Sequence, residues 1–331
     1  MSDRPGPSFG ALDLGTNNCR LLVARPRGTG FRVVDAFSRI VRLGEGVAQS
    51  GRLSEEAVER TIGALRVCAG KLRRGSVSRY RAVATEACRR AENRQAFVDR
   101  VDHETGLSME IISPAEEVQL ALDGCTPLFD RTMQHVLLLD IGGGSTELIW
   151  VRLDDGQPPA LAGWTSIGHG VVTLAERYGG DRVARASYAA MVAEIGAAIG
   201  PFAEPHDISA GAAAGTVQLL GTSGTVTTIA GIHLGLPRYD RDRVDGLRLQ
   251  FGDVRAVIDT VIDQDYEARA AQPCIGPGRG DVMIAGCAIL EAVMAACPAG
   301  QLDVADRGLR EGMLLRMMRA ARADHGQEAR T

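Results

Sequence analysis

The chain has 331 residues, more than a single hydrophobic core usually supports, so we expect two domains. Hydrophobic residues make up 45% and charged residues 24% of the chain, which excludes an extensively disordered protein. The formal net charge of −4 excludes a general nucleic-acid or membrane-surface binder, because a basic field holds such partners.

The cysteine usage and the apolar segments indicate the compartment. Seven cysteines are scattered without CxxC spacing, which favours a reducing compartment over a disulfide framework or a zinc site. No signal-peptide pattern opens the chain, and the longest apolar stretch, residues 282–297, contains Glu291 and is too short to cross a bilayer. We therefore expect a cytoplasmic protein with no membrane or nucleic-acid partner.

The first half alternates extended and helical patterns. A strand, a turn and a second strand are expected over residues 9–25. A helix begins after Ser54, where Glu55 and Glu56 occupy the first turn. The other expected elements are strands at 31–34, 80–84 and 109–113 and helices at 93–105 and from 115. This alternation predicts an α/β fold.

The second half follows a linker-like segment at residues 127–134, so we predict domains at 1–130 and 131–331. Its expected strands lie at 136–139, 148–151 and 218–220. Its expected helices lie at 171–178, 186–199, 254–263, 282–296 and 309–321. We expect the last helix to be able to pack back on the first domain.

One pattern occurs twice: an apolar run ends in Asp13 or Asp140, a turn of glycine and small polar residues follows, and a second apolar run begins. Either copy alone is compatible with a plain β-hairpin. Glycine lets the main chain approach a ligand, and successive N–H groups form a concave surface that suits phosphate oxygens. Two copies predict two similar half-sites facing one ligand. The residues expected to bind its phosphates are Gly15, Thr16, Asn17, Asn18, Gly142, Gly143, Gly144, Ser145 and Thr146.

Acidic residues beside these turns suggest a metal site, and an acidic pair elsewhere in the chain suggests a base. Asp13, Asp140 and Glu147 are candidates for holding Mg²⁺, or alternatively Mn²⁺, because hard cations prefer carboxylate and phosphate oxygens. Glu147 has the alternative of a carboxylate at a strand end. Glu116 and Glu117 begin a helix after a strand and are candidates for activating water, although the helix dipole also favours acids there.

With these residues in view, the chain resembles the exopolyphosphatase and guanosine pentaphosphate phosphatase family over nearly its whole length. The resemblance rests on several segments in order, namely 13–17, 43–47, 84–89, 116–117, 140–147, 221–225 and 306–312. It implies a two-domain, actin-like and ribonuclease-H-like fold with the active site in the interdomain cleft. It also implies metal-dependent hydrolysis of a terminal phosphate from inorganic polyphosphate or guanosine pentaphosphate.

The resemblance further implies that Glu117 is the general base and that Arg89 is aimed at the phosphate chain. The chain is similar to the short, two-domain form of the family, for which a homodimer is an open option. It departs from the family pattern at Pro114-Ala115, where a glycine is usual before the acidic pair.

Some alternatives stay open at this point. The turn at residues 221–225 is compatible with a further phosphate or guanosine contact and equally with tight helix packing. An ATP-dependent kinase or ATPase of the same superfold, and a non-catalytic polyphosphate or alarmone sensor, are the competing functions.

Overall fold

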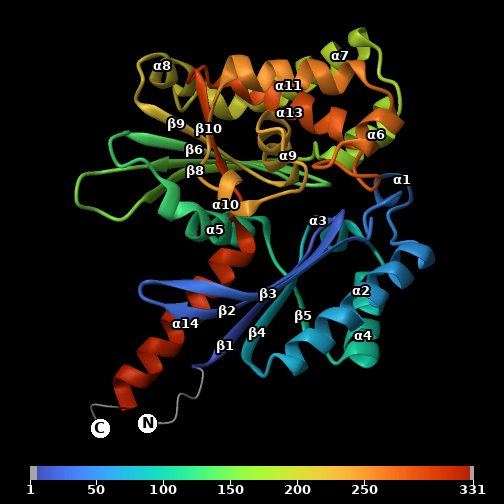
Figure 1. Ribbon diagram of the computed structural model, residues 1–331, viewed down its shortest axis with the longest axis vertical. Helices are drawn as coiled ribbons and strands as arrows, with labels where there is room; N and C mark the ends of the chain where they lie inside the picture. Colours follow the sequence, from blue (N-terminus) through green and yellow to red (C-terminus); the bar gives the residue numbers. More distant parts are fainter. Residues whose placement is uncertain (1–5, 329–331) are drawn as a thin grey trace. The chain divides into compact units, whose positions relative to one another are not determined.

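The computed structural model describes residues 6–328, which form two α/β units, each with its own sheet (Figure 1). The first unit runs to Gly124 and resumes at Gly308, and the second unit is Cys125–Arg307. The chain therefore passes between the units twice. The α/β class expected from the sequence is confirmed.

The sheet of the first unit has the strand order β3-β2-β1-β4-β5. β2 runs antiparallel to both β1 and β3, whereas β4 and β5 run parallel to β1. This order with a reversed second strand is that of ribonuclease-H-like sheets, as the resemblance implied. The strands are β1 (Ser8–Leu14), β2 (Asn18–Arg27), β3 (Gly30–Ile40), β4 (Val77–Ala84) and β5 (Met109–Ile111).

Helices cover both faces of this sheet because successive side chains of β1 point to opposite sides. Leu12 packs into a core with residues of α2 and α4, whereas Phe9 packs with residues of α5 and α14. The final helix thus belongs to the core of the first unit. The helices are α1 (Val47–Ser50), α2 (Glu55–Arg74), α3 (Glu86–Arg90), α4 (Arg94–Thr105), α5 (Pro114–Cys125) and α14 (Leu309–Glu328).

Two helix starts follow directly from local chemistry. The hydroxyl of Ser54 accepts the Ala57 amide at 3.2 Å, which satisfies a free N–H at the start of α2. Pro114 opens α5, where its missing N–H costs nothing, and the Ser113 hydroxyl accepts the Glu116 amide at 3.2 Å. The Pro114-Ala115 departure is therefore compatible with a regular helix start.

The sheet of the second unit has the order β10-β11-β9-β6-β7-β8. β6, β7 and β8 are antiparallel neighbours, β9 runs parallel to β6, and β11 runs parallel to β9. The first unit's order is therefore repeated, with β10 added antiparallel at one edge. The strands are β6 (His135–Ile141), β7 (Thr146–Arg152), β8 (Ala160–Ile167), β9 (Val217–Thr222), β10 (Arg248–Gln250) and β11 (Gln301–Ala305).

Most helices of the second unit pack into one large core with this sheet. Among the described residues, α7 is the one helix whose length and composition would suffice to span a bilayer. Its Met191, Ile195 and Ile199 side chains are buried in that core, as in an ordinary core helix. The helices are η1 (Thr126–Leu128), α6 (Val171–Tyr178), α7 (Arg185–Ala203), α8 (Ile208–Ala213), α9 (Gly224–His233), α10 (Arg241–Val244), α11 (Phe251–Asp263), α12 (Tyr266–Ala271) and α13 (Met283–Ala296).

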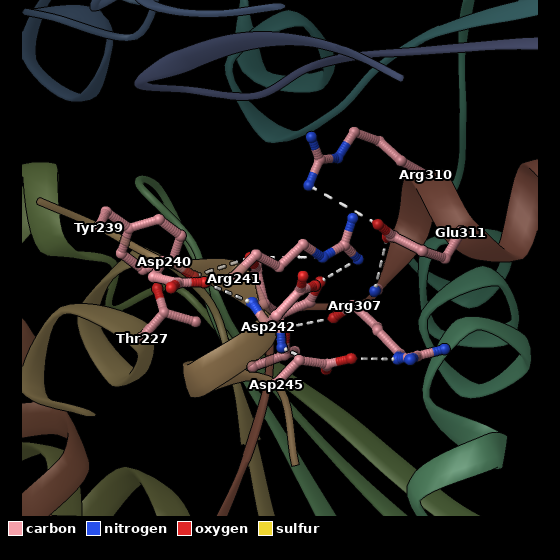
Figure 2. Close-up of polar contacts among 12 residues, drawn as sticks. Thr227, Tyr239, Asp240, Arg241, Asp242, Asp245, Arg307, Arg310 and Glu311 are labelled. Carbon is pink, nitrogen blue, oxygen red and sulfur yellow. Dashed lines mark hydrogen bonds and ion pairs between the residues drawn. The ribbon is translucent and has the colours of Figure 1, made fainter. Parts of the chain in front are cut away.

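A polar network holds the chain where β11 ends (Figure 2). Asp245 accepts both the Asp306 amide at 3.0 Å and Arg307 Nε at 2.7 Å. The Tyr239 hydroxyl donates to the Asp306 carboxylate at 2.7 Å, and Arg241 donates to the Asp306 carbonyl oxygen at 2.6 Å. The segment leading to the last helix is thereby anchored in the second unit up to Arg307.

Candidate active site

The two glycine turns are closed by the same backbone hydrogen bond. In the first unit the Gly15 amide donates to the Asn18 carbonyl oxygen at 2.9 Å, and in the second the Gly142 amide donates to the Ser145 carbonyl oxygen at 2.9 Å. Each turn joins the first and second strands of its sheet. The pattern found twice in the sequence is thus a structural duplication.

Each turn accepts backbone hydrogen bonds from the segment that follows the third strand of its sheet. In the first unit, the Val41 and Arg42 amides donate to the Asn17 carbonyl oxygen, and the Gly44 amide donates to that of Thr16. We call residues 41–46 the first brace. It accounts for the Leu43-Gly44-Glu45-Gly46 motif, whose role the sequence did not reveal.

The second brace, residues 168–172, holds the second turn in the same way. The Val171 amide donates to the Gly142 carbonyl oxygen at 3.0 Å, and the Val172 amide donates to that of Gly143 at 2.8 Å. A Cβ atom on Gly170 would lie 2.3 Å from the Gly143 oxygen, so only glycine allows this approach. The backbone of the second turn is therefore fixed by its neighbour.

The two aspartates have different cross-strand neighbours. Asp13 lies opposite Arg20 of β2, whereas Asp140 lies opposite Glu147 of β7 and beside Thr222 of β9. Residues opposite each other in an antiparallel pair are close enough to interact. The second turn is therefore the more acidic of the two and the better place for a cation.

Burial raises the pKa of the Asp13 carboxyl, against the lowering influence of Arg20 and Arg310. Glu311, which follows Arg310 on α14, contributes a further rise. The first turn of α14 is thus electrostatically coupled to the first glycine turn. Sequence spacing could not reveal this, because α14 lies almost 300 residues downstream.

Glu147 is buried and orders the second turn. The residue is only 3% exposed, and its Oε1 atom accepts hydrogen bonds from the hydroxyls of Ser145 and Ser166, each at 2.7 Å. The Thr146 hydroxyl donates to the His169 carbonyl oxygen at 2.6 Å. The hydroxyls of Ser145 and Thr146, both expected to face phosphate, thus make bonds within the protein.

The first turn carries an unsatisfied polar atom. Asn17 is 6% exposed, and its Oδ1 atom has no hydrogen-bond partner among the described residues. A buried polar group without a partner costs free energy, on the order of 1–3 kcal/mol. A hydrogen-bond donor from outside the protein, such as a water molecule, would offset this cost.

The two candidate base residues take different partners. Glu117 Oε2 accepts Arg89 Nη1 at 2.7 Å, and its side chain is 15% exposed. Glu116 Oε1 accepts Arg81 Nη2 at 2.6 Å, and the same arginine also binds Glu110. Consecutive positions on a helix point in different directions, so one glutamate pairs with Arg89 and the other with Arg81.

Arg89 is shared between two carboxylates. Its Nε and Nη2 atoms donate to Glu86 Oε2 at 3.1 and 2.9 Å, and Nη1 donates to Glu117 and to the Ile112 carbonyl oxygen. Burial lowers the pKa of Arg89, but Glu117 and Glu86 outweigh it and hold the pKa above its ordinary value. The arginine stays charged and holds Glu117 in place.

The turn after β9 is strained. Ser223 has φ = 117°, a region that residues other than glycine rarely adopt, and its buried Oγ atom lacks a partner among the described residues. Because Thr222 pairs with Asp140, this turn lies at the same sheet edge as the second glycine turn. The two turns of the second unit are therefore close neighbours.

Among the side chains described, those of residues 6–324, no group of three or more histidine, cysteine or acidic residues is placed to hold a metal ion. A magnesium site built by the protein alone is thus not evident in the described part of the chain. One or two carboxylates together with substrate phosphates are, however, the usual way in which enzymes hold Mg²⁺. The hard oxygen donors of Asp140 and Glu147 fit that arrangement.

Sequence reasoning missed several residues that shape the site. Glu86 binds Arg89, Ser166 binds Glu147, and His169 belongs to the second brace. For the braces, the available signal was the duplication itself, because aligning the two halves places both of them after the third strand. The i,i+3 spacing of Glu86 and Arg89 on α3 was also visible in the sequence, whereas the Ser166–Glu147 bond depends on tertiary proximity and had no sequence signal.

The protein has two ribonuclease-H-like sheets, each with a braced glycine turn after an aspartate-bearing strand. These features place it in the actin-like, ribonuclease-H-like class of two-domain α/β proteins. The family model described as "Ppx/GppA phosphatase family" matches residues 22–321. The chain therefore belongs to the Ppx/GppA phosphatase family.

Known relatives cover most of this chain. "Exopolyphosphatase 2" of Mycobacterium tuberculosis is 30% identical over 328 residues, covering 92% of this chain and 97% of the relative. The "Guanosine-5'-triphosphate,3'-diphosphate pyrophosphatase" of Aeromonas hydrophila is 29% identical, covering 93% of this chain but 59% of the relative. The chain thus spans less than two thirds of that longer relative.

Solved structures share the fold. An exopolyphosphatase-like protein matches with a TM-score of 0.84 at 31% identity, covering 94% of this chain and 97% of that chain. The Aquifex aeolicus member of the Ppx/GppA family matches with a TM-score of 0.77 at 27% identity, covering 95% and 98%. The family-level resemblance found in the sequence is thereby confirmed.

Proposed function

We propose that this protein hydrolyses the terminal phosphate of inorganic polyphosphate, of guanosine pentaphosphate, or of both. The observation that carries the proposal is the duplicated, braced glycine turn after Asp13 and Asp140, in a member of a phosphatase family. Polyphosphate is the favoured substrate, because the Mycobacterium exopolyphosphatase is matched over nearly its full length. Hydrolysis of guanosine pentaphosphate is supported by a relative that extends well beyond this chain.

The reaction requires a positioned phosphate, a water molecule and a base. Water attacks the terminal phosphorus, the bond to the bridging oxygen breaks, and the shortened chain leaves with that oxygen. Glu117, in the first turn of α5, accepts the proton of the water, and Arg89 orients its carboxylate. Glu116 is the weaker candidate, since it is paired with Arg81, which also binds Glu110.

Backbone amides of the two turns bind phosphate oxygens, at Gly15, Thr16, Asn17 and Asn18 and at Gly142, Gly143, Gly144, Ser145 and Thr146. The orphaned Asn17 Oδ1 is a hydrogen-bond acceptor, so it would take a donor such as a bound water molecule and not a phosphate oxygen. Thr146 contributes its backbone alone, since its hydroxyl is bonded to His169.

Asp140 is the carboxylate best placed to hold Mg²⁺ or Mn²⁺, with Glu147 adding charge and ordering Ser145. A bound divalent cation would neutralise the charge of the phosphate oxygens. Asp13 stays a weaker candidate, because its cross-strand neighbour is the cationic Arg20.

The test compares initial rates of phosphate release from long polyphosphate, guanosine pentaphosphate and ATP, each with Mg²⁺ and with excess chelator. We expect release from polyphosphate with Mg²⁺ and none with the chelator. Glu117→Gln should lower kcat by at least about 100-fold, whereas Glu116→Gln should retain most of it. Both proteins must show wild-type circular dichroism.

The alternatives predict other outcomes. Turnover of ATP alone would favour the kinase or ATPase reading. Tight polyphosphate binding without phosphate release would favour the sensor, and normal turnover by folded Glu117→Gln protein would remove the base assignment.

A further inference from the structure

Glu86 has no assigned role, yet it makes the most extensive contact with Arg89. One carboxylate oxygen of Glu86 accepts both Nε and Nη2 of the guanidinium. The third nitrogen, Nη1, is left to donate to Glu117 at 2.7 Å and to the Ile112 carbonyl oxygen at 3.0 Å. The direction in which Arg89 presents Nη1 is therefore set by Glu86.

The three side chains are largely removed from water. The exposed fractions of the Glu86, Arg89 and Glu117 side chains are 20%, 14% and 15%. Charges in such surroundings are screened less than surface charges, so each carboxylate affects the other through the shared cation. Two carboxylates around one guanidinium leave one net negative charge.

The balance of charge among Glu86, Arg89 and Glu117 affects how readily Glu117 accepts a proton. A glutamate that had Arg89 to itself would be strongly stabilised as the anion and would be a poor proton acceptor. The negative charge of Glu86 offsets part of this stabilisation. Glu117 is consequently held in one orientation without losing as much of its basicity.

We propose that Glu86 is a positioning residue for the reaction, which orients Arg89 and preserves the basicity of Glu117. This inference rests on the proposed function, in which Glu117 accepts the proton of the attacking water. It assigns to Glu86 no contact with substrate.

Two substitutions test the charge of Glu86 and the length of its side chain separately. Glu86→Gln retains an oxygen that can accept from Arg89 but removes the charge. Glu86→Asp retains the charge but shortens the side chain by one methylene. Glu92→Gln is the matched control, because Glu92 lies near α3 and, among the described side chains, pairs with Arg52 alone, in an exposed contact at 3.6 Å.

The main measurement is the pH dependence of kcat and KM with long polyphosphate and Mg²⁺. In Glu86→Gln protein we expect the acid limb of kcat to move down by about one pH unit and kcat on its plateau to fall about three- to tenfold, without a rise in KM. A loss of structure alone would not move the acid limb. Glu86→Asp and Glu92→Gln proteins should keep the wild-type acid limb.

Charged groups of α3 and β4 bear on Glu117 in the described structure. Arg89 and Glu86 face it from α3, and its helix neighbour Glu116 is paired with Arg81 of β4. Carboxyl-carbon NMR of glutamate-labelled protein, assigned with Glu117→Gln, reads the titration of Glu117 directly. We expect Glu117 to titrate at lower pH in Glu86→Gln protein than in the wild type.

The outcomes distinguish this inference from the proposed function. An unmoved acid limb and an unmoved Glu117 titration in folded Glu86→Gln protein, with Glu117→Gln inactive, would overturn the role of Glu86 alone. Full turnover by Glu117→Gln protein would overturn the base assignment, whatever the titration of Glu117 shows. A rise in KM with an unchanged acid limb would assign Glu86 to substrate binding and contradict the inference.

Discussion

Glu117, Glu147 and Glu194 are three glutamates whose neighbours give each a different role. Arg89 orients Glu117, two serine hydroxyls bind Glu147, and Glu194 joins two helices to the second brace. The Arg177 guanidinium, helped by the Tyr178 hydroxyl and the His169 ring, lowers the pKa of Glu194 from its ordinary value of 4.5 to about 2. The partners of a carboxylate, more than its residue type, decide what it does.

The lowered pKa of Glu194 predicts a pH-dependent contribution to stability. Because the folded-state pKa lies below the unfolded value, the stabilisation is present above about pH 4.5 and is lost as the pH falls toward 2. Glu194→Gln should therefore lower the free energy of unfolding by about 1–2 kcal/mol at neutral pH. Urea unfolding should show this deficit shrinking between about pH 4.5 and about pH 3.

Glu204 provides the control for this prediction, since it is exposed at the end of the same helix. Glu204→Gln should leave stability within about 0.5 kcal/mol of the wild type. A Glu194→Gln deficit that is the same at every pH would contradict the electrostatic explanation.

At the scale of elements, the brace and the glycine turn form one unit of structure. In both halves of the chain, amides of the brace donate hydrogen bonds to carbonyl oxygens of the turn, with N–O distances of 2.8–3.0 Å in the second half. Turn amides that are fixed before the ligand arrives need little reorganisation during the reaction, which favours catalysis. The geometry of the proposed phosphate site therefore depends on the braces as well as on the turns.

Gly170→Ala tests the second brace. The new methyl group would lie 2.3 Å from the Gly143 carbonyl oxygen, so the turn or the brace must move. We expect kcat/KM for phosphate release to fall at least about tenfold, with a stability loss of about 1–3 kcal/mol. Gly168→Ala is the matched control, because a Cβ atom there meets nothing within 4 Å. Equal activity of the two variants would show that the close approach of the brace is dispensable.

At the scale of the molecule, the first unit is assembled from two distant parts of the chain. α14 packs against β1 and α5, and its Met313 and Leu314 lie in the same core as Phe9 and Leu120. The approach is close, since a Cβ atom on Gly312 would lie 2.0 Å from the Leu120 carbonyl oxygen. The C-terminal helix is thus a structural part of the N-terminal unit.

Gly312→Ala should separate α14 from α5 and lower the free energy of unfolding by about 1–3 kcal/mol. Gly63→Ala is a matched helical control, because a Cβ atom there meets nothing within 4 Å and alanine favours the helix. Thermal and urea unfolding of both variants measure the difference. A Gly312→Ala protein as stable as the wild type would contradict this close packing.

Local patterns predicted much of this architecture. The hairpin around each turn, the start of α2 after Ser54 and the helix that carries Glu117 all have short-range causes, namely alternation, capping and glycine placement. β8, β10 and β11 were not predicted. β10 and β11 have only three and five residues, and β8 carries glycine and small residues in place of a clear apolar alternation, so neighbouring strands stabilise all three more than their own pattern does.

By itself, the sequence determined the α/β class, the family, the repeated turn and the identity of the candidate acids, since each depends on neighbouring residues or on order along the chain. Only the tertiary structure decided which acid meets which cation: Glu117 with Arg89 and Glu86, Glu116 with Arg81, and Asp13 near Arg310. Apart from Glu86 and Arg89, which lie three residues apart on α3, these pairings join segments that are far apart in sequence, and long-range packing brings such charges together in ways that local propensity does not encode.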